Sequence, residues 1–114
     1  MTDCIFCKIL EGKIPSKIVY EDQKFLAFED IKPKAPVHIL LIPKKHIARV
    51  RDVKEENKEL LGDLLLTADA IAKKNNIAES GYRTVINCNK DAGQEVPHLH
   101  LHILGGKKLS WIPG

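Results

Sequence analysis

Residues 98–104 have the sequence His98-Leu99-His100-Leu101-His102-Ile103-Leu104, and this alternation is the strongest indication of the fold. Successive side chains of a β-strand point to opposite faces, so a strand here places three histidines on one face and apolar residues on the other. The apolar face suits a core. Imidazoles act near neutral pH as nucleophiles, proton carriers or metal ligands. A strand that merely happens to be histidine-rich is the alternative, but three of the chain's five histidines lie here, which favours a chemical role.

The composition is that of one small globular domain, expected to span residues 1–114. With 44% hydrophobic and 29% charged residues, the chain fits an ordinary soluble protein. The net charge of +3 comes from 18 basic residues scattered among 15 acidic ones, so we expect no nucleic-acid partner. Neither a membrane-spanning run nor an export signal is recognisable, and we therefore expect no membrane association and a cytoplasmic location.

The rest of the chain alternates between short strands and helices. Four further strands are predicted, at residues 18–21, 24–29, 37–42 and 82–88. Helical spacing of apolar side chains predicts one long helix over residues 53–75, capped by Asp52, and residues 4–12 fit a short helix closed by Gly12. The sequence therefore predicts an α+β protein with about five strands, one long helix and one short helix.

Two more histidines lie in and just after the predicted strand at residues 37–42. His38 interrupts an otherwise apolar run, as in a central strand buried on both faces. Such a histidine is usually a core residue. We favour a functional role because the strand at 98–104 needs a neighbour, and His38 facing its histidines would complete a cluster. His46 lies in the loop after this strand.

The cysteines point to metal or redox chemistry. Two of the three form a Cys4-x-x-Cys7 pair, and an odd count in a chain without signs of export argues against a disulfide framework. The pair alone is a weak signal, and a thioredoxin-like site stays open, although no βαβ pattern surrounds it. Cys88 is expected to be a small buried apolar residue.

Several motifs together resemble a known family. The matching segments are His98–Gly106, Asp30-Ile31, Ala35–His38, Ile42–His46 and Trp111–Gly114. They make the chain similar to histidine triad (HIT) proteins of the Hint branch, which are purine nucleoside phosphoramidases. The resemblance covers nearly the whole chain. It implies an antiparallel five-stranded sheet with one long and one short helix per subunit, and a homodimer of two such subunits.

The resemblance also implies a mechanism. The middle histidine, His100, would attack the α-phosphorus of a purine nucleoside phosphoramidate and form a nucleotidyl-histidine, which water then cleaves. His102 would hold a phosphate oxygen or the leaving group, and His38 would fix the tautomers and charge of the cluster. With His98, the first histidine of the triad, these residues make up the expected catalytic set.

The nucleotide-binding residues follow from the same resemblance. Asp30 would accept both ribose hydroxyls, and an apolar cleft would hold the purine between Phe6, Ile9, Phe28 and Ile31. Asn87 and the backbone N–H near Gly93 would contact the phosphate, since glycine lets a main-chain donor approach closely. On the residues alone, ordinary packing explains these positions equally well.

A structural zinc ion is a further implication. Some bacterial relatives bind zinc through a Cys-x-x-Cys pair, the histidine after Pro-Lys-Lys and the first triad histidine, which here are Cys4, Cys7, His46 and His98. Four protein ligands leave no open coordination position, so the zinc would be structural.

Two positions bear on the leaving group. Glu95 stands where the Hint branch has a serine thought to assist the leaving amine, and a carboxylate there would repel the substrate phosphate unless a raised pKa kept it protonated. Trp111 is the only tryptophan. In the Hint branch this tail crosses the dimer interface toward the partner's active site, so we expect Trp111 to help select the amine; a tail packed on its own subunit is the alternative.

Two other functions stay open. One is a zinc-stapled nucleotide-binding module that acts through protein partners. The other is a dinucleoside polyphosphate hydrolase of the Fhit-like branch, against which the short chain and the Trp111 tail argue. Turnover of a nucleoside phosphoramidate would separate the phosphoramidase from both.

Overall fold

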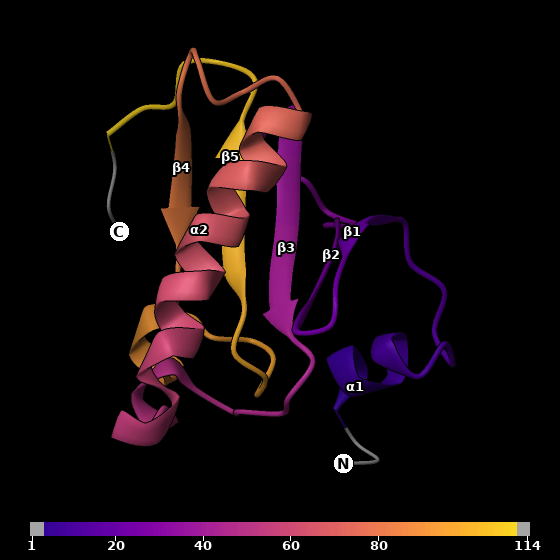
Figure 1. Ribbon diagram of the computed structural model, residues 1–114. Coiled ribbons are helices and arrows are strands. Elements are labelled where there is room, and N and C mark those ends of the chain that lie inside the picture. Colours follow the sequence, from indigo (N-terminus) through magenta and orange to yellow (C-terminus); the bar gives the residue numbers. More distant parts are fainter. Residues whose placement is uncertain (1–3, 112–114) are drawn as a thin grey trace.

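The computed structural model describes residues 4–111. One antiparallel sheet has the strand order β1-β2-β3-β5-β4, with the long helix α2 packed across one face (Figure 1). The strands are β1 (Ile18–Glu21), β2 (Phe25–Glu29), β3 (Val37–Pro43), β4 (Tyr82–Val85) and β5 (Leu101–Gly105). The helices are α1 (Ile5–Leu10), α2 (Lys58–Lys74) and the short 3-10 turns η1 (Val50–Asp52), η2 (Glu55–Asn57) and η3 (Lys90–Ala92). The predicted α+β architecture is confirmed.

The central strands β2 and β3 are buried on both faces, because their residues alternate between two apolar clusters. Phe25 of β2 and Leu41 of β3 pack with the inner side of α2, together with Leu101 of β5. Phe28 points the other way, into a smaller cluster covered by Phe6 of α1. The second cluster matters for function, because it lies on the histidine side of β5.

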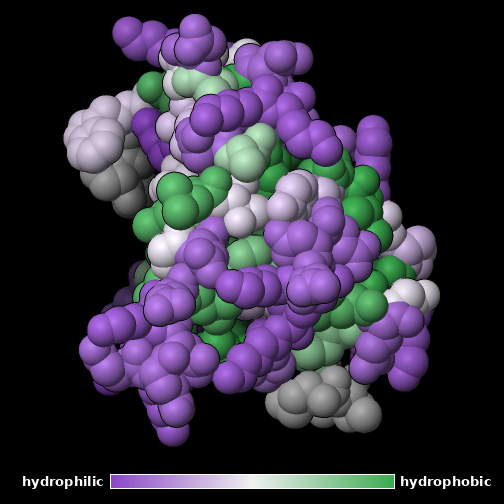
Figure 2. Space-filling view, viewed as in Figure 1, coloured by the Kyte–Doolittle hydropathy of each residue, from purple (hydrophilic) through white to green (hydrophobic). Residues whose placement is uncertain are grey.

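The outer side of α2 keeps apolar side chains in solvent. Leu66 is 73% exposed and Leu65 is also exposed. Figure 2 shows this side of the molecule, where hydrophobic patches lie between hydrophilic side chains. Among residues 4–111, no helix combines the length and the apolar character needed to cross a membrane.

Helix α2 begins later than the predicted residue 53. Asp52 does not cap it, because the carboxylate is held by the guanidinium of Arg49, with nitrogen–oxygen distances of 2.7 and 2.8 Å. The turns η1 and η2 occupy the interval, and Asn57 precedes the first helical residue without a capping side-chain hydrogen bond.

Two strand boundaries also differ from the prediction. The pairing of β4 ends at Val85, opposite His102, rather than at residue 88. Strand β5 begins at Leu101, because the ladder between β3 and β5 ends at the pair Leu41–Leu101. Residues 98–100 therefore precede the strand, and all three are buried.

Candidate active site and an adjoining metal-ligand cluster

Histidines from two neighbouring strands meet on the face away from α2. His38 lies on β3 and His102 on β5, and the pairing of these strands brings His38 Nε2 within 2.9 Å of His102 Nδ1. The His100 ring is the next neighbour, with its centroid 5.2 Å from that of His102. The three rings thus form a continuous line, and Phe6 of α1 packs edge-on against His100 at 5.2 Å.

Hydrogen bonds fix the tautomers along this line. The backbone N–H of Lys34 donates to His38 Nδ1 at 3.0 Å, so a neutral His38 carries its proton on Nε2. That N–H faces His102 Nδ1, and it lies 3.4 Å from an Asp30 carboxylate oxygen. His102 Nδ1 accordingly accepts, and its own proton resides on Nε2. The network therefore makes His102 Nε2 a donor.

His100 has the opposite tautomer. Its Nδ1 lies 2.7 Å from the carbonyl oxygen of His98, which can only accept, so the proton is on Nδ1 and the lone pair on Nε2. No residue between 4 and 111 bonds to Nε2, and no side-chain nitrogen or oxygen that is both buried and unpaired exists in that range. Nε2 therefore retains contact with solvent. His100 Nε2, with its lone pair facing solvent, is therefore the atom that an electrophile would meet.

Burial keeps the supporting histidines uncharged. It lowers the pKa of His102 to about 4, and the neighbouring His100 and His38 rings act in the same direction. Burial also lowers the pKa of His38, against the opposite pull of the Asp30 carboxylate. Both rings are therefore neutral at pH 7, as the tautomer assignment requires.

A second cluster brings together Cys4, Cys7, His46 and His98, whose ligand atoms all lie within 4.8 Å of one another. Tetrahedral zinc, with bonds of about 2.0 Å to nitrogen and about 2.3 Å to sulfur, implies edges of about 3.3 Å between nitrogens and about 3.5 Å between nitrogen and sulfur. The two Nδ1 atoms are 3.1 Å apart, and three sulfur–nitrogen distances are 3.3, 3.4 and 3.6 Å. The four residues fit a tetrahedral metal site.

The surroundings orient these ligands. His98 Nε2 donates to the carbonyl of Pro43 at 2.8 Å, which leaves the Nδ1 lone pair pointing into the cluster. Cys4 caps α1 and accepts the backbone N–H of Cys7 at 3.3 Å. Burial and the nearby Cys4 raise the pKa of Cys7 to about 11, so its thiolate, the form that binds a metal, needs a cation beside it.

A metal fits less well at the second grouping of possible ligands, Asp30, His38 and His102. A metal on His38 Nε2 would move the ring proton to Nδ1, where the Lys34 N–H already donates. Two donors would then face each other. This grouping is better suited to passing a proton than to binding a cation.

The predicted phosphate contacts lie on one loop between β4 and β5. Gly93 has a φ of +79°, a conformation that glycine adopts without strain. The Asn87 amide donates to the Ala92 carbonyl at 2.8 Å and so holds the turn before Gly93. Glu95 is exposed and shares with Gly93 a cavity of about 480 Å³.

The other predicted nucleotide-binding residues differ in burial, and only some of them contact one another. Phe6 and Phe28 are buried and contact each other, with centroids 5.4 Å apart, and Ile9 packs against their cluster. Ile31 is 90% exposed, next to Asp30. Trp111 is 82% exposed in the single subunit, and residues 112–114 of the matching tail lie outside the described residues.

Two contributors were missed from the sequence. The Lys34 backbone amide has no side-chain signature, although Pro33 and Pro36 lack N–H groups and leave few donors in that loop. Gln94 makes three side-chain hydrogen bonds to backbone groups. A single glutamine in a loop gives no sequence signal of that kind.

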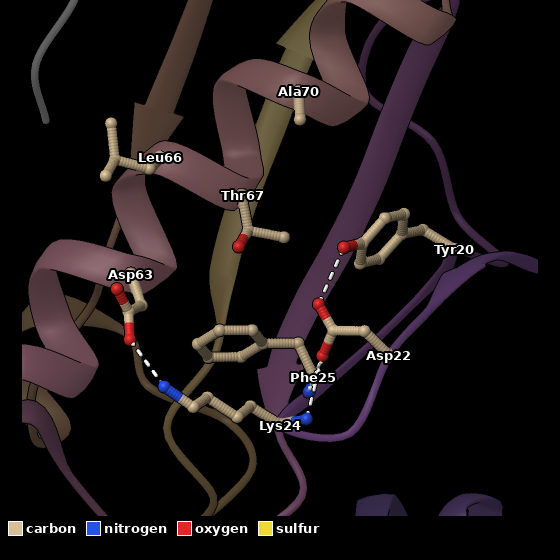
Figure 3. Close-up of a pocket in the computed structure, with 8 residues that line it drawn as sticks. All are labelled: Tyr20, Asp22, Lys24, Phe25, Asp63, Leu66, Thr67 and Ala70. Atoms are coloured by element: carbon tan, nitrogen blue, oxygen red, sulfur yellow. Dashed lines mark hydrogen bonds and ion pairs between the residues drawn. The ribbon is translucent and has the colours of Figure 1, made fainter.

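A cavity of about 330 Å³ lies elsewhere, between the β1–β2 hairpin and α2 (Figure 3). Four of its polar side chains, those of Tyr20, Asp22, Lys24 and Asp63, already have partners. Tyr20 donates to Asp22 at 2.6 Å, and Asp22 accepts the backbone N–H of Lys24, whose ammonium group pairs with Asp63 at 2.8 Å. With these partners in place, the cavity offers little to a ligand, and we place the site at the histidines.

Comparison with known proteins agrees with this geometry. The HIT domain family matches residues 11–109. An uncharacterized HIT-like protein of Buchnera aphidicola subsp. Baizongia pistaciae is 51% identical over 112 residues, covering 98% of this chain and all of the relative. Another, from Synechococcus elongatus, is 54% identical over 112 residues, covering 98% of this chain and 97% of its own.

Solved structures agree in fold as well. The crystal structure of a HIT family hydrolase from Legionella pneumophila matches with a TM-score of 0.95 and 51% identity, over 98% of this chain and all of that one. A histidine triad protein from Clostridium difficile matches with a TM-score of 0.93 and 47% identity, over 96% of each chain.

Proposed function

This chain belongs to the HIT domain family, and on that premise we propose that it hydrolyses purine nucleoside phosphoramidates, with His100 as the nucleophile. The observation that carries the proposal is the hydrogen bond from His100 Nδ1 to the His98 carbonyl, 2.7 Å long. It holds the ring in the tautomer whose Nε2 lone pair is available. The family's solved members include proteins named hydrolases, in keeping with a hydrolytic reaction.

In the first step, His100 Nε2 forms a bond to phosphorus as the phosphorus–nitrogen bond of the substrate breaks. His102 Nε2–H donates a hydrogen bond to a phosphoryl oxygen, and the departing amine takes a proton from solvent, because a neutral His102 that lost its only ring proton would become an imidazolate. In the second step, water attacks the nucleotidyl-histidine, its proton passes to solvent, and a nucleoside monophosphate leaves. His38 supports both steps, because its Nε2–H holds His102 Nδ1 as an acceptor at 2.9 Å.

The substrate would lie between the histidines and two flanking regions. Asp30 would accept the ribose hydroxyls, and the purine would contact the apolar side of α1 at Phe6 and Ile9. The phosphate would meet the loop that carries Asn87 and Gly93. Phe28 would support the cleft from behind and Ile31 would close over the base.

Cys4, Cys7, His46 and His98 would bind structural zinc. Zinc in such a site contributes folding stability when bound, and with four protein ligands it has no open position for substrate. The fit rests on the tetrahedral spacing of the four ligand atoms and on the His98 lone pair fixed by Pro43.

We further propose a homodimer whose tails help to select the amine. Leu65, Leu66 and Trp111 are exposed in the single subunit, and a second subunit would cover apolar surface of this kind. Trp111 would then lie near the partner's leaving-group region, where Glu95 replaces the serine of the Hint branch.

The test is a turnover assay with adenosine phosphoramidates of several amines, alongside dinucleoside polyphosphates. His100→Ala should lower the rate by several orders of magnitude, because the covalent intermediate forms on one nitrogen, His100 Nε2. AMP affinity should change little. Near-normal turnover by His100→Ala would contradict the mechanism, and AMP binding without any turnover by the natural protein would favour the binding module instead.

A further inference from the structure

The Gln94 side chain ties together three backbone segments. Its Oε1 accepts the backbone N–H of Asn89 at 2.9 Å. Its Nε2 donates to the carbonyls of Ala48 at 2.8 Å and Val96 at 3.0 Å. One amide thus satisfies a donor and two acceptors that no regular secondary structure pairs.

The loop fastened in this way is the one that carries Gly93. Asn89, at its start, has a φ of +70°, an uncommon conformation for a residue with a side chain. Arg49 donates to the Asn89 side-chain oxygen at 3.0 Å, while the other end of the guanidinium pairs with Asp52. Gln94 and Arg49 therefore hold a backbone conformation that Asn89 alone would not keep.

The anchor at the other end, Ala48, lies close in sequence to the metal-ligand cluster. Ala48 lies two residues after His46, and the intervening Ile47 carbonyl accepts the backbone N–H of Leu99 at 2.6 Å. Leu99 stands between His98 and His100. Gln94 therefore joins the segment that supplies His46 to the loop that carries Gly93.

We propose that Gln94 is a positioning residue, and this proposal rests on the proposed function. By its hydrogen bonds to the backbone of Asn89, Ala48 and Val96, Gln94 holds the Gly93 loop where the N–H groups of the loop meet the substrate phosphate. Gln94 does not touch the substrate. Its effect is confined to the part of the ligand that the loop contacts, the phosphate.

The three hydrogen bonds of Gln94 require an amide, which has both an acceptor and a donor. Glutamate has nearly the same shape, but it replaces the Nε2 donor with an oxygen that would face two carbonyl oxygens. Gln94→Glu therefore breaks the contacts to Ala48 and Val96 by repulsion. Gln23 is the chain's only other glutamine and lies exposed in the β1–β2 turn, so Gln23→Glu makes the same chemical change away from the site.

The experiment compares AMP with adenosine, which lacks the phosphate, by calorimetric titration of the natural protein, Gln94→Glu and Gln23→Glu. We expect Gln94→Glu to weaken AMP roughly tenfold or more, as for a buried hydrogen-bond partner that is lost, while adenosine affinity stays the same. The kcat for an adenosine phosphoramidate should fall about a hundredfold, as for small displacements of positioning groups. Gln23→Glu should match the natural protein.

Hydrogen exchange supplies a readout independent of catalysis. The Asn89 amide should exchange faster in Gln94→Met, which removes its acceptor, while the amides of β3 and β5 keep their protection. Gln94→Met removes all three side-chain hydrogen bonds without adding charge, and it also takes the place of Gln94→Glu in the binding experiment if that variant does not fold.

Three results would overturn the proposal: unchanged AMP affinity in the Gln94 variant, equal weakening of AMP and adenosine, or unchanged exchange at Asn89 in Gln94→Met. A different result would contradict the proposed function. The natural protein itself would then bind AMP no more tightly than adenosine and would turn over no phosphoramidate, and the positioning role of Gln94 would be contradicted as well.

Discussion

Removing zinc from the cluster of Cys4, Cys7, His46 and His98 should lower thermal stability by a large and calculable amount. A ligand bound only by the folded state at about 1,000 times its Kd stabilises that state by about 4 kcal/mol. For 114 residues, an unfolding entropy of about 2.1 cal/mol/K per residue gives about 0.24 kcal/mol/K. The metal-free protein should therefore unfold roughly 17 °C below the zinc-loaded one.

The assay is a calorimetric scan of the protein with excess zinc and after chelation, together with elemental analysis of protein purified without chelator. Cys4→Ser should lower Tm in zinc and lose most of the zinc response. It should affect the chemical step less than it affects stability, because the closed site does not activate water.

Cys88→Ser is the matched control, since Cys88 lies outside the cluster. It should keep the full response to zinc. Purified protein without zinc, or a Tm that zinc leaves unchanged in the natural protein, would refute the reasoning that the four ligands form a structural metal site.

Three further predictions concern the histidine line and the tail. Lys34→Pro removes the N–H that donates to His38, so it should lower kcat and shift the His102 ring nitrogens in ¹⁵N NMR spectra, whereas Lys34→Arg keeps both the amide and the positive charge and should change neither. Because burial lowers the pKa of His102 to about 4, the unfolded chain binds a proton that the folded chain does not bind as pH falls below about 6.5. The stability of the metal-free natural protein in urea should therefore be highest above that pH and should decline toward pH 4, more steeply than that of metal-free His102→Gln. Equal slopes in the two proteins would contradict the assignment. Deleting residues 109–114, which include Trp111, should reorder the rates among phosphoramidates with different amines; an unchanged ranking would show that the tail only packs.

The sequence predicted the sheet well because period-two alternation directly determines which face of a strand is buried. Leu101 and Ile103 are fully buried against α2, on the side opposite the histidines, as the alternation requires. The proximity of His38 to His102 could also be anticipated, since a buried apolar strand with one histidine had to lie beside another strand.

Element boundaries were less predictable, because they depend on which of several possible partners a side chain or backbone group meets in the folded chain. Asp52 has a suitable type and position for a helix cap, but Arg49 binds its carboxylate first. Residues 98–100 have strand periodicity, yet β3 ends its pairing at Leu41, so no ladder extends to them.

The supporting contacts of the site were not predictable at all. Lys34 acts through a backbone amide that every non-proline residue has, and Gln94 acts through carbonyls at positions 48 and 96. Ile31 and Phe28 were both assigned to one apolar cleft, but only the three-dimensional structure separates an exposed loop residue from a buried one.

His98 serves two neighbours with two different parts of itself. Its ring completes the metal-ligand cluster, while its backbone carbonyl orients His100, the proposed nucleophile. Every amino acid has that carbonyl, so evolution can replace the ring without removing the acceptor that His100 needs. A lineage that discards Cys4 and Cys7 can therefore keep His100 aligned, and metal binding and the proposed catalysis become separately heritable traits encoded two residues apart, at His98 and His100.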